Sequence, residues 1–206
     1  MRPVDEALAR AGLAVEVDAA AAGRLKEFLR LRGQWAKTHN LAGPRALASP
    51  WQIDVVDGLA VYGVMAPTVP LVDVGAGGGV PGLIVAAMKP DLAVFLVEPR
   101  AKRAAFLRTA VHALSLSKVR VLRTRWPLDY TLGPVQVVSR AVVSPESWPD
   151  LALQGGREVE GVLRMLAAER PKVINDDIEL RRWVDYGAVA DGGRRVEYWG
   201  RRPGPV

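Results

Sequence analysis

The fold is decided by the stretch Leu71-Val72-Asp73-Val74-Gly75-Ala76-Gly77-Gly78-Gly79-Val80-Pro81-Gly82. An apolar run ends in an acid, and a glycine-rich turn follows, in which the backbone can take positive φ and let a ligand approach closely. The proline then suits the first turn of a helix, where its missing N–H is not needed. Strand–turn–helix units of this kind hold nucleotide-like ligands at the carboxyl edge of a parallel sheet.

The glycine turn satisfies two ligand-binding patterns. Residues 77–82 satisfy G-x-G-x-x-G, the dinucleotide fingerprint, in which the helix N-terminus receives a pyrophosphate. Residues 73–79 satisfy D-x-G-x-G-x-G, which resembles motif I of class I S-adenosylmethionine-dependent methyltransferases. The acid favours a cationic ligand, and the proline removes one N–H donor for an anion. We therefore expect S-adenosylmethionine as the cofactor, bound by Asp73, Gly75 and Gly77.

A second acid follows the next predicted strand. Residues 92–97 are apolar, and Glu98 ends this run 25 residues after Asp73. A carboxylate at the tip of the second strand is placed to accept hydrogen bonds from ribose hydroxyls. Because dinucleotides and S-adenosylmethionine both carry a ribose, Glu98 supports the fold without separating the two cofactors. A carboxylate that simply ends a strand in solvent remains the alternative.

Composition narrows the class of protein. No apolar run approaches the roughly 20 residues of a membrane span, and the N-terminus has no signal-peptide pattern, so we expect a cytoplasmic protein without a membrane partner. The absence of cysteine excludes disulfides and cysteine nucleophiles, and two scattered histidines make a metal site unexpected. A net charge of +6 and a pI near 10.0 favour a polyanionic partner, although an arginine- and alanine-rich composition would show the same bias.

Apolar periodicity predicts an α/β fold. Helices are expected over residues 4–13 and 16–37, and a third from Ser49-Pro50, which is the pattern of an N-cap followed by a first-turn proline. Strands and helices then alternate over 70–74, 81–89, 92–98, 100–114, 118–122, 135–139 and 145–153. The tail has possible strands at 161–166, 184–189 and 195–199 around a helix near 175–183. We expect a doubly wound, mostly parallel sheet of the class I methyltransferase type over residues 66–206, with an N-terminal helical extension over 1–65.

The start of the helix at 100–114 is unusually basic. Arg100, Lys102 and Arg103 crowd its first turn, where cations oppose the helix dipole at a cost of about 0.3–1 kcal/mol each. An RNA phosphate backbone crossing the cofactor crevice would account for this placement. An ordinary solvated charged turn is the alternative.

Several short motifs accompany the glycine turn. They are Trp35, Asn40-Leu41 with Arg45, Asp57 with Leu59, Lys102-Arg103, Phe106-Leu107-Arg108, Ser139-Arg140-Ala141 and Arg201-Arg202-Pro203-Gly204. Together they resemble the bacterial 16S ribosomal RNA guanine-N7 methyltransferases, the glucose-inhibited division protein B family. The resemblance runs from about residue 31 to residue 142 and returns at the C-terminus.

The resemblance implies roles for particular residues. S-adenosylmethionine contacts would come from Gly75, Val80, the main chain at Trp126-Pro127 and Arg140, with Arg140 also the candidate catalytic residue. Ribosomal RNA contacts are expected from Asn40, Arg45, Lys102, Arg103, Arg201 and Arg202. The chain also departs from the family pattern. Trp126-Pro127 stands where the family usually has a small residue followed by Glu, and Gln136 stands where Asp is common. Asp54 and Gly58 replace the usual His and Ser. The Lys-Gly expected after the fifth strand is absent, and Leu163-Arg164-Met165 occupies about that place.

The chemistry of guanine N7 agrees with this composition. N7 is an acceptor with no proton to remove, so its methylation needs no general base, and none is obvious here. Amine methylation usually accompanies an Asn/Asp-Pro-Pro-aromatic motif, whereas residues 139–142 read Ser-Arg-Ala-Val. Arg140 could hydrogen-bond the guanine base, anchor the cofactor, or simply pair with a carboxylate at the sheet edge.

Three interpretations therefore compete. We favour a monomeric 16S rRNA guanine-N7 methyltransferase. A methyltransferase of the same fold that acts on another RNA or a small molecule is the second, and a catalytically silent RNA-binding module is the third. Cofactor binding separates the third from the other two.

Overall fold

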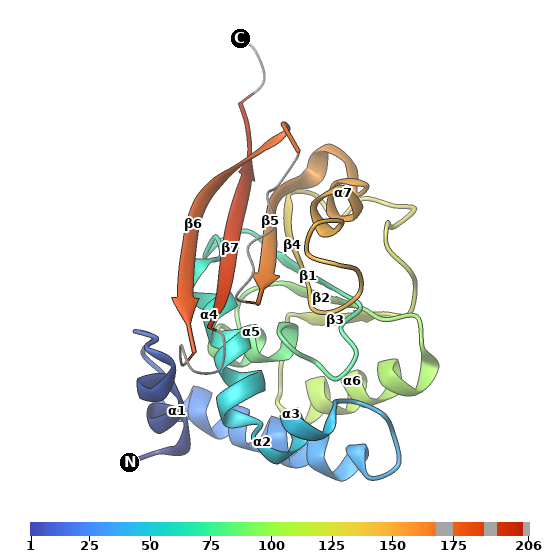
Figure 1. The fold of residues 1–206 in the computed structure, drawn as a ribbon. Helices are drawn as coiled ribbons and strands as arrows, with labels where there is room; N and C mark the ends of the chain where they lie inside the picture. The colour runs from blue at the N-terminus through green and yellow to red at the C-terminus, as the bar shows by residue number, and fades with distance from the viewer. Residues whose placement is uncertain (168–174, 188–192, 204–206) are drawn as a thin grey trace.

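The computed structural model describes residues 1–167, 175–187 and 193–203 (Figure 1). Within these residues seven strands form one sheet in the order β3-β2-β1-β4-β5-β7-β6. Strands β1 to β5 are parallel, and β7 pairs antiparallel with both β5 and β6. Their bounds are β1 Leu71–Val74, β2 Val94–Val97, β3 Val119–Leu122, β4 Val135–Ser139, β5 Val159–Leu166, β6 Ile178–Tyr186 and β7 Arg194–Arg201. The predicted mostly parallel sheet is confirmed.

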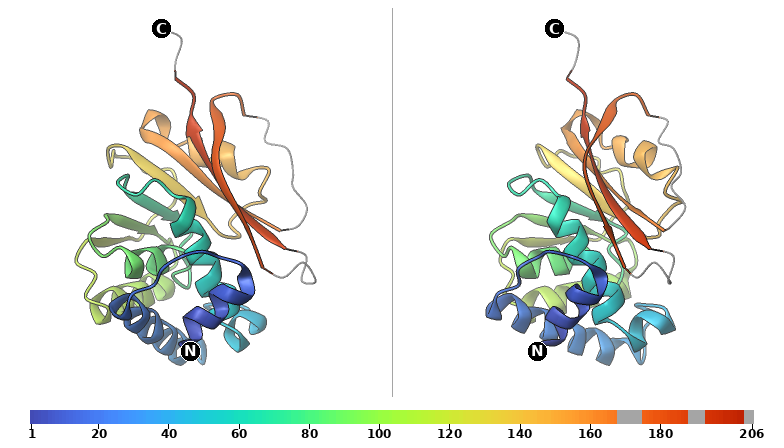
Figure 2. Two further views of the ribbon diagram at one scale, coloured as in Figure 1. Left: turned by 90° about the vertical axis from the view of Figure 1, so that its left-hand side faces the viewer. Right: turned by 60° about the vertical axis from the view of Figure 1, so that its left-hand side comes forward.

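Helices cover both faces of the sheet, as Figure 2 shows. One apolar cluster joins the sheet to α1 (Pro3–Ala11), α2 (Ala19–Ala36), α4 (Val56–Val64), α5 (Gly82–Met88) and α6 (Ala101–Ala113). A second cluster on the opposite face contains α7 (Trp148–Leu153) and apolar residues of the loop that follows β3. Short elements complete the described chain: α3 (Pro44–Ala48), the π-helical turn η1 (Trp51–Val55) and the 3-10 turn η2 (Gly156–Glu158).

The buried helix α4 positions the charged residues discussed below. It contacts α5, β6 and β7, and its apolar residues are buried on every side. A helix that is apolar all round belongs in a protein interior. Gly58 permits this packing, because a Cβ on it would lie 2.6 Å from the Ile84 side chain. Asp57 on α4 and Asp54 on the preceding turn η1 are both buried, and a carboxylate in the interior needs charged or hydrogen-bonding partners.

The N-terminal elements share the core of the sheet. Side chains of α1, α2 and α4 belong to the same apolar cluster as those of α5 and α6. The third predicted helix was expected to begin with Ser49 as N-cap and Pro50 in the first turn. In the structure the turn η1 precedes α4, the N-cap residue of η1 is Pro50, and no side chain caps η1. The helix α3 was not predicted. Among the described helices, none is long and apolar enough to cross a bilayer.

The predicted helix near residues 175–183 is wrong, because residues 178–186 form strand β6. The Glu-Leu-Arg-Arg run in this segment has good helix propensity, but antiparallel pairing with β7 overrides it, since propensity is a weak prior against tertiary contacts. The possible strand at 184–189 is the end of β6 as far as Tyr186, and its positions 188–189 lie outside the described residues. The predicted strands at 161–166 and 195–199 are confirmed as parts of β5 and β7.

Candidate cofactor and RNA site

The glycine turn links the carboxyl end of β1 to α5. Gly75, Gly77 and Gly79 have φ values of 71°, 51° and 83°. Residues other than glycine rarely adopt this left-handed backbone conformation. The backbone N–H groups of Gly75 and Ala76 both donate to the Val97 carbonyl, at 2.8 and 3.0 Å. The turn is therefore held against the end of β2 with its backbone close to the crevice.

Asp73 faces the start of α5 rather than open solvent. Its Oδ2 accepts a hydrogen bond from the Gly82 N–H at 2.8 Å, and its Oδ1 has no hydrogen-bond partner among the described residues. Burial raises the pKa of Asp73 to about 7, although the Gly82 hydrogen bond and the charge of Arg140 act in the opposite direction. One carboxylate oxygen thus supports the turn, and the second is a buried acceptor whose hydrogen-bonding capacity is unused among the described residues.

Glu98 directly follows β2 and holds the next part of the turn. Its Oε2 accepts from the Gly77 N–H at 3.0 Å, and its Oε1 accepts from the Arg100 N–H at 2.8 Å. The side chain is buried, so the alternative of a carboxylate free in solvent does not apply. Each carboxylate oxygen has two lone pairs, so these bonds leave acceptor capacity for ribose hydroxyls.

The N-terminal loop covers the same turn. Arg103 donates from Nη2 to the Asn40 carbonyl at 2.9 Å, and its Nη1 lies 3.6 Å from the position of a Cβ on Gly77. Arg103 therefore ties the loop to the cofactor turn instead of projecting from the basic helix start. Lys102, in contrast, is exposed.

Two family motifs prove to be mutual packing partners. The rings of Trp35 on α2 and Phe106 on α6 lie 5.7 Å apart between centroids. This contact fixes α6, and with it the basic turn, against the N-terminal helices. The two aromatic residues thus support the site without facing it.

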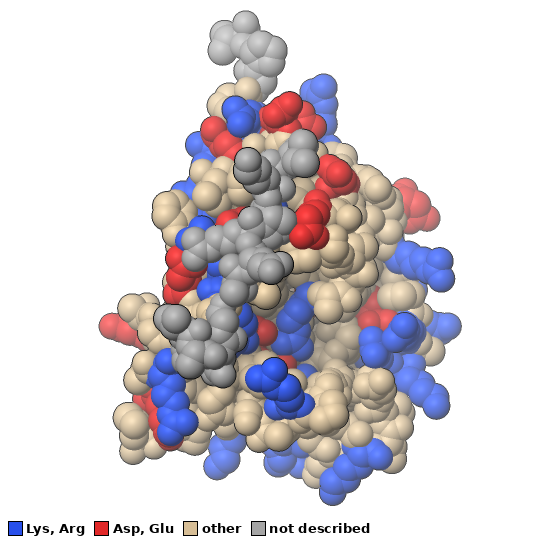
Figure 3. Space-filling model, viewed as in Figure 1, with Lys and Arg blue, Asp and Glu red and all other residues tan. Residues whose placement is uncertain are grey.

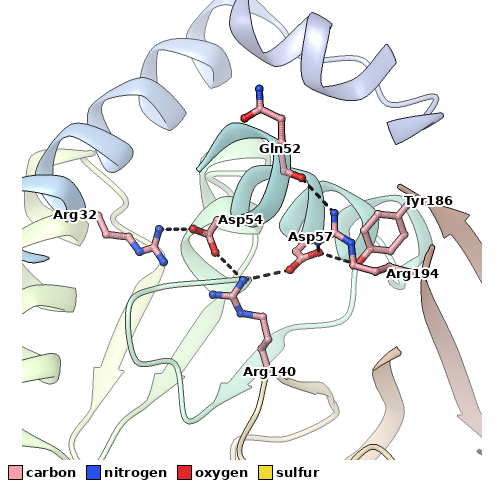
Figure 4. Close-up of polar contacts among 7 residues, drawn as sticks. All are labelled: Arg32, Gln52, Asp54, Asp57, Arg140, Tyr186 and Arg194. Carbon is pink, nitrogen blue, oxygen red and sulfur yellow. Dashed lines mark hydrogen bonds and ion pairs between the residues drawn. The ribbon is translucent and has the colours of Figure 1, made fainter. Parts of the chain in front are cut away.

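Arg140 follows β4 beside the glycine turn and enters a buried charge cluster (Figure 4). The parallel register of β1 and β4 pairs Val74 with Ser139, so the segments that follow these two strands leave the sheet side by side. Val142 reaches Gly75, where a Cβ would come within 2.2 Å of its side chain. Arg140 Nη1 lies 2.7 Å from Asp54 Oδ1 and 3.2 Å from Asp57 Oδ2, so the carboxylate pairing considered from the sequence is present.

The rest of the cluster was not predicted. Asp54 Oδ2 also pairs with Arg32 Nη1 at 2.5 Å, while Asp57 Oδ1 accepts from Tyr186 Oη at 2.9 Å and from Arg194 Nη1. Arg194 donates in addition to the Gln52 carbonyl at 3.2 Å. No sequence signal could have joined α2, η1, α4, β4, β6 and β7 at one point. The Asp57 motif was the one available indication.

Burial and charge act in opposite directions within this cluster. Burial lowers the pKa of Arg140, but the carboxylates of Asp54 and Asp57 raise it by more, so its net pKa is above the ordinary value. Burial also raises the pKa of the Asp57 carboxyl, whereas the charges of Arg194 and Arg140 lower it. The two neighbouring arginines therefore oppose the neutralisation that burial favours at Asp57.

The loop after β3 carries Trp126 and Pro127. The Trp126 indole N–H donates to the Leu151 carbonyl at 2.9 Å, which anchors the loop to α7. Pro127 is exposed and has no N–H to offer a ligand. Val80 is buried within the apolar cluster at the end of the glycine turn. The structure thus gives Trp126 a supporting contact and leaves the proposed main-chain contacts of this loop as predictions.

The predicted RNA residues fall on two edges of the sheet. Asn40, Arg45 and Lys102 are exposed near the carboxyl edge, and Figure 3 shows basic side chains gathered over the lower part of the face that carries α3 and α6. Arg201 and Arg202 lie where β7 passes the start of β5, at the opposite edge. Arg201 donates to the Val159 and Gly156 carbonyls at 2.8 and 2.6 Å, so much of its guanidinium is engaged within the chain.

The departures from the family pattern have local explanations. Asp54 pairs with Arg32 and Arg140, and Gly58 leaves the space that Ile84 fills. The Gln136 amide forms three hydrogen bonds of 2.7 to 2.9 Å with the backbone of Ala66 and Val69, which fixes the segment entering β1. These residues are integrated into the fold.

The residues present fit S-adenosylmethionine. Positive-φ glycines give close backbone approach, Glu98 offers a ribose acceptor, and the Asp73 oxygen without a partner suits a cationic group. In the described part of the chain no group of three or more His, Asp or Glu side chains is placed to hold a metal ion.

Comparisons with known proteins give the same assignment. A family model described as rRNA small subunit methyltransferase G matches residues 22–175. Ribosomal RNA small subunit methyltransferase G of Halorhodospira halophila is 34% identical over 159 residues, covering 77% of this chain and 75% of its own. The protein of the same name from Chromohalobacter salexigens is 32% identical over 203 residues, covering 95% and 97%.

Solved structures share the fold at low sequence identity. TrmK of M. capricolum, in complex with S-adenosyl-homocysteine, aligns with a TM-score of 0.55 and 7% identity, over 70% of this chain and 67% of its own. This likeness shows the fold. The chain belongs to the rRNA small subunit methyltransferase G family and is an S-adenosylmethionine-dependent methyltransferase of the class I fold.

Proposed function

We propose that this enzyme methylates N7 of a guanine in 16S ribosomal RNA. The observation that carries the proposal is geometric. The glycine turn that Glu98 holds and Arg140, which follows β4, leave neighbouring strands at the same edge of the sheet. Family membership supports the ribosomal substrate, since the named relatives are ribosomal RNA small subunit methyltransferases.

In this proposal the glycine turn and the two acids hold the cofactor. Glu98 accepts from the ribose, Asp73 faces the cationic amino-acid end, and the backbone at Gly75, Gly77 and Val80 lies along the ligand. When bound, S-adenosylmethionine supplies an electrophilic methyl carbon. Displacement then requires alignment of a lone pair at about 3–3.5 Å rather than proton removal.

Guanine N7 suits the side chains that the site offers. N7 presents a lone pair and no proton, so the reaction proceeds without a general base. Arg140, charged and partly exposed, can donate to guanine O6 and orient the base. The described residues contain no Asn/Asp-Pro-Pro-aromatic motif after β4, which disfavours amine methylation.

We place the RNA across the carboxyl edge. The side chains of Lys102, Arg45 and Asn40 are exposed and would contact phosphates, which position a substrate without reading its sequence. Arg201 and Arg202 would contact a more distant part of the RNA. A ribosomal substrate also favours a cytoplasmic enzyme, which we propose acts as a monomer with residues 1–65 as an extension of a methyltransferase domain over 66–206.

The test is methyl transfer to small-subunit RNA from a strain in which the corresponding gene is deleted. The RNA and the assembled particle are each incubated with protein and methyl-labelled S-adenosylmethionine, then digested to nucleosides and analysed by mass spectrometry. We expect label in 7-methylguanosine at one position. Label in another nucleoside would contradict the N7 assignment, and cofactor binding without transfer to either substrate would favour a silent RNA-binding module.

A further inference from the structure

Five charged side chains meet beside the crevice, and we call them the charge cluster: Arg32, Asp54, Asp57, Arg140 and Arg194 (Figure 4). Asp54 and Arg32 are almost fully buried, whereas 27% of the Arg140 side chain and 28% of the Arg194 side chain are exposed. The cluster thus extends from the interior to the rim of the site. Two of its members lie near the glycine turn. The charge of Arg140 acts on Asp73, and Arg32 Nε lies 3.1 Å from the position of a Cβ on Gly78.

Both aspartates hold Arg140 by the same atom. Nη1 donates to Asp54 Oδ1 at 2.7 Å and to Asp57 Oδ2 at 3.2 Å, which uses the two hydrogens of that nitrogen. Three N–H donors of the guanidinium remain, one on Nε and two on Nη2, and the Nε–H and one Nη2–H share one edge of the planar group. Fixing Nη1 from one side therefore directs the Nε–Nη2 edge away from the aspartates.

Charge balance explains why Asp54 matters for that orientation. Three arginines surround two aspartates, so the cluster carries one excess positive charge. Without the Asp54 charge, the three cations would share one carboxylate. Arg32 cannot leave because its side chain is 1% exposed, but Arg140 at the rim can turn toward solvent.

Asp57 is oriented from the other side. Tyr186 of β6 and Arg194 of β7 both donate to its Oδ1, which leaves Oδ2 facing Arg140. The β6–β7 hairpin therefore influences the position of a side chain that follows β4. No chemical step needs Asp54 or Asp57 to touch the substrate.

We propose that Asp54 and Asp57 are positioning residues for methyl transfer, which hold Arg140 Nη1 so that its Nε–Nη2 edge donates to O6 of the target guanine. This rests on the proposed function, because it assigns Arg140 to the substrate base. Donation to O6 leaves the N7 lone pair free for the methyl group. The Arg140 guanidinium then orients the base, because Asp54 and Asp57 restrict the rotation of the Arg140 side chain.

The first experiment measures single-turnover methyl transfer for Asp54→Asn and Asp57→Asn. Because hydrogen bonds to charged groups are lost, we expect the rate to fall roughly 10- to 100-fold, with the dissociation constants for S-adenosylmethionine and RNA within about threefold of wild type. Arg32→Met/Asp54→Asn removes both buried charges and replaces Asp54→Asn if that protein does not fold; the same loss of rate is expected.

Gln136→Leu serves as the control. It removes a buried amide at the start of β4, whose three hydrogen bonds go to the backbone of Ala66 and Val69, and it leaves every member of the charge cluster in place. This variant is expected to lower the melting temperature and to keep the single-turnover rate within about threefold of wild type. An equal loss of rate in Gln136→Leu, or an unchanged rate in Asp54→Asn, would overturn the positioning role.

A modified substrate tests the contact with O6. Once the methylated position is mapped, 2-aminopurine is placed there, since it lacks O6 and retains N7. Wild type should lose about the same factor in rate as Asp54→Asn does on guanine, and Asp54→Asn should lose little more. Additive losses would show that Arg140 does not act on O6.

A substrate-free measurement separates this proposal from the proposed function. Rotation about the Nε–Cζ bond of Arg140 exchanges its Nη1 and Nη2 positions, and ¹⁵N-edited NMR spectra of the apo protein measure the rate. If Asp54 and Asp57 hold Nη1, this rotation should be slow in wild type and faster in Asp54→Asn. Free rotation in wild type would refute the positioning role even if methyl transfer occurs. Slow rotation in a protein that methylates no guanine would contradict the proposed function while retaining the held geometry.

Discussion

Gly78 of the glycine turn lies directly against Leu41 of the N-terminal loop, so close that a Cβ on Gly78 would come 2.4 Å from the Leu41 carbonyl oxygen. The same Cβ would lie 3.1 Å from Arg32 Nε. Since the nearest atom belongs to backbone, the contact cannot be relieved by a side-chain rotation. The N-terminal helices are thereby joined to the cofactor turn through a glycine.

Gly78→Ala should therefore disturb the cofactor turn. We expect a loss of about 1–3 kcal/mol in stability from overpacking, together with weaker S-adenosylmethionine binding in calorimetric titration. Gly33→Ala is the matched control, because nothing lies within 4 Å of the added carbon and the residue is exposed on α2. That control should raise stability by roughly 0.5–1 kcal/mol. Normal cofactor affinity in Gly78→Ala would show that the loop moves freely.

Glu98 is best tested by an isosteric change. Glu98→Gln retains one oxygen acceptor for the Gly77 or Arg100 N–H but removes the negative charge, so S-adenosylmethionine binding should weaken by about 1–3 kcal/mol. Glu98→Ala should lower the melting temperature as well, because two backbone donors lose their partner. If Glu98→Gln binds the cofactor as wild type does, Glu98 only supports the turn.

Cofactor affinity should depend on pH through Asp73. Burial raises the pKa of Asp73 to about 7 from 3.8, so the folded protein binds more protons than the unfolded chain between these values. The contribution of Asp73 to stability therefore decreases as pH rises through this window. A cationic ligand favours the ionised form, so S-adenosylmethionine affinity should rise about tenfold between about pH 6 and about pH 8.

Calorimetric titration at several pH values measures this dependence. Asp73→Asn is the matched variant, because it retains an acceptor for the Gly82 N–H and cannot ionise. Its affinity should be lower than that of wild type at about pH 8 and should change little with pH. The same slope in both proteins would assign the titration to another group.

The two edges of the sheet separate the RNA predictions. Lys102→Gln, at the carboxyl edge, should weaken RNA binding and reduce the slope of affinity against salt by about one contact. Arg202→Gln, at the opposite edge, reports whether the RNA extends that far. A filter-binding salt titration measures both. If the slope of RNA affinity against salt is the same in Lys102→Gln as in wild type, the basic first turn of α6 is an ordinary solvated surface that does not contact RNA.

Local chemistry made part of this protein predictable. The acid, the glycine turn and the proline of residues 71–82 define a strand–turn–helix whatever lies around them, and the carboxylate of Glu98 lies where the end of a strand puts it. These features depend on backbone geometry within a few residues. The same holds for the alternation of strands and helices up to β4.

Tertiary structure decided the rest. The segment 178–186 is a strand because it pairs with β7, and not because of its own propensity. Arg103 contacts the Asn40 carbonyl, and Arg140 meets Asp54 and Asp57, because packing brings together elements separated by 63 to 86 residues. The sequence by itself determined the cofactor turn and the family motifs, since these are encoded within short stretches. Only the folded chain decided which charges are buried together, because burial and ion pairing depend on contacts between residues far apart in the chain.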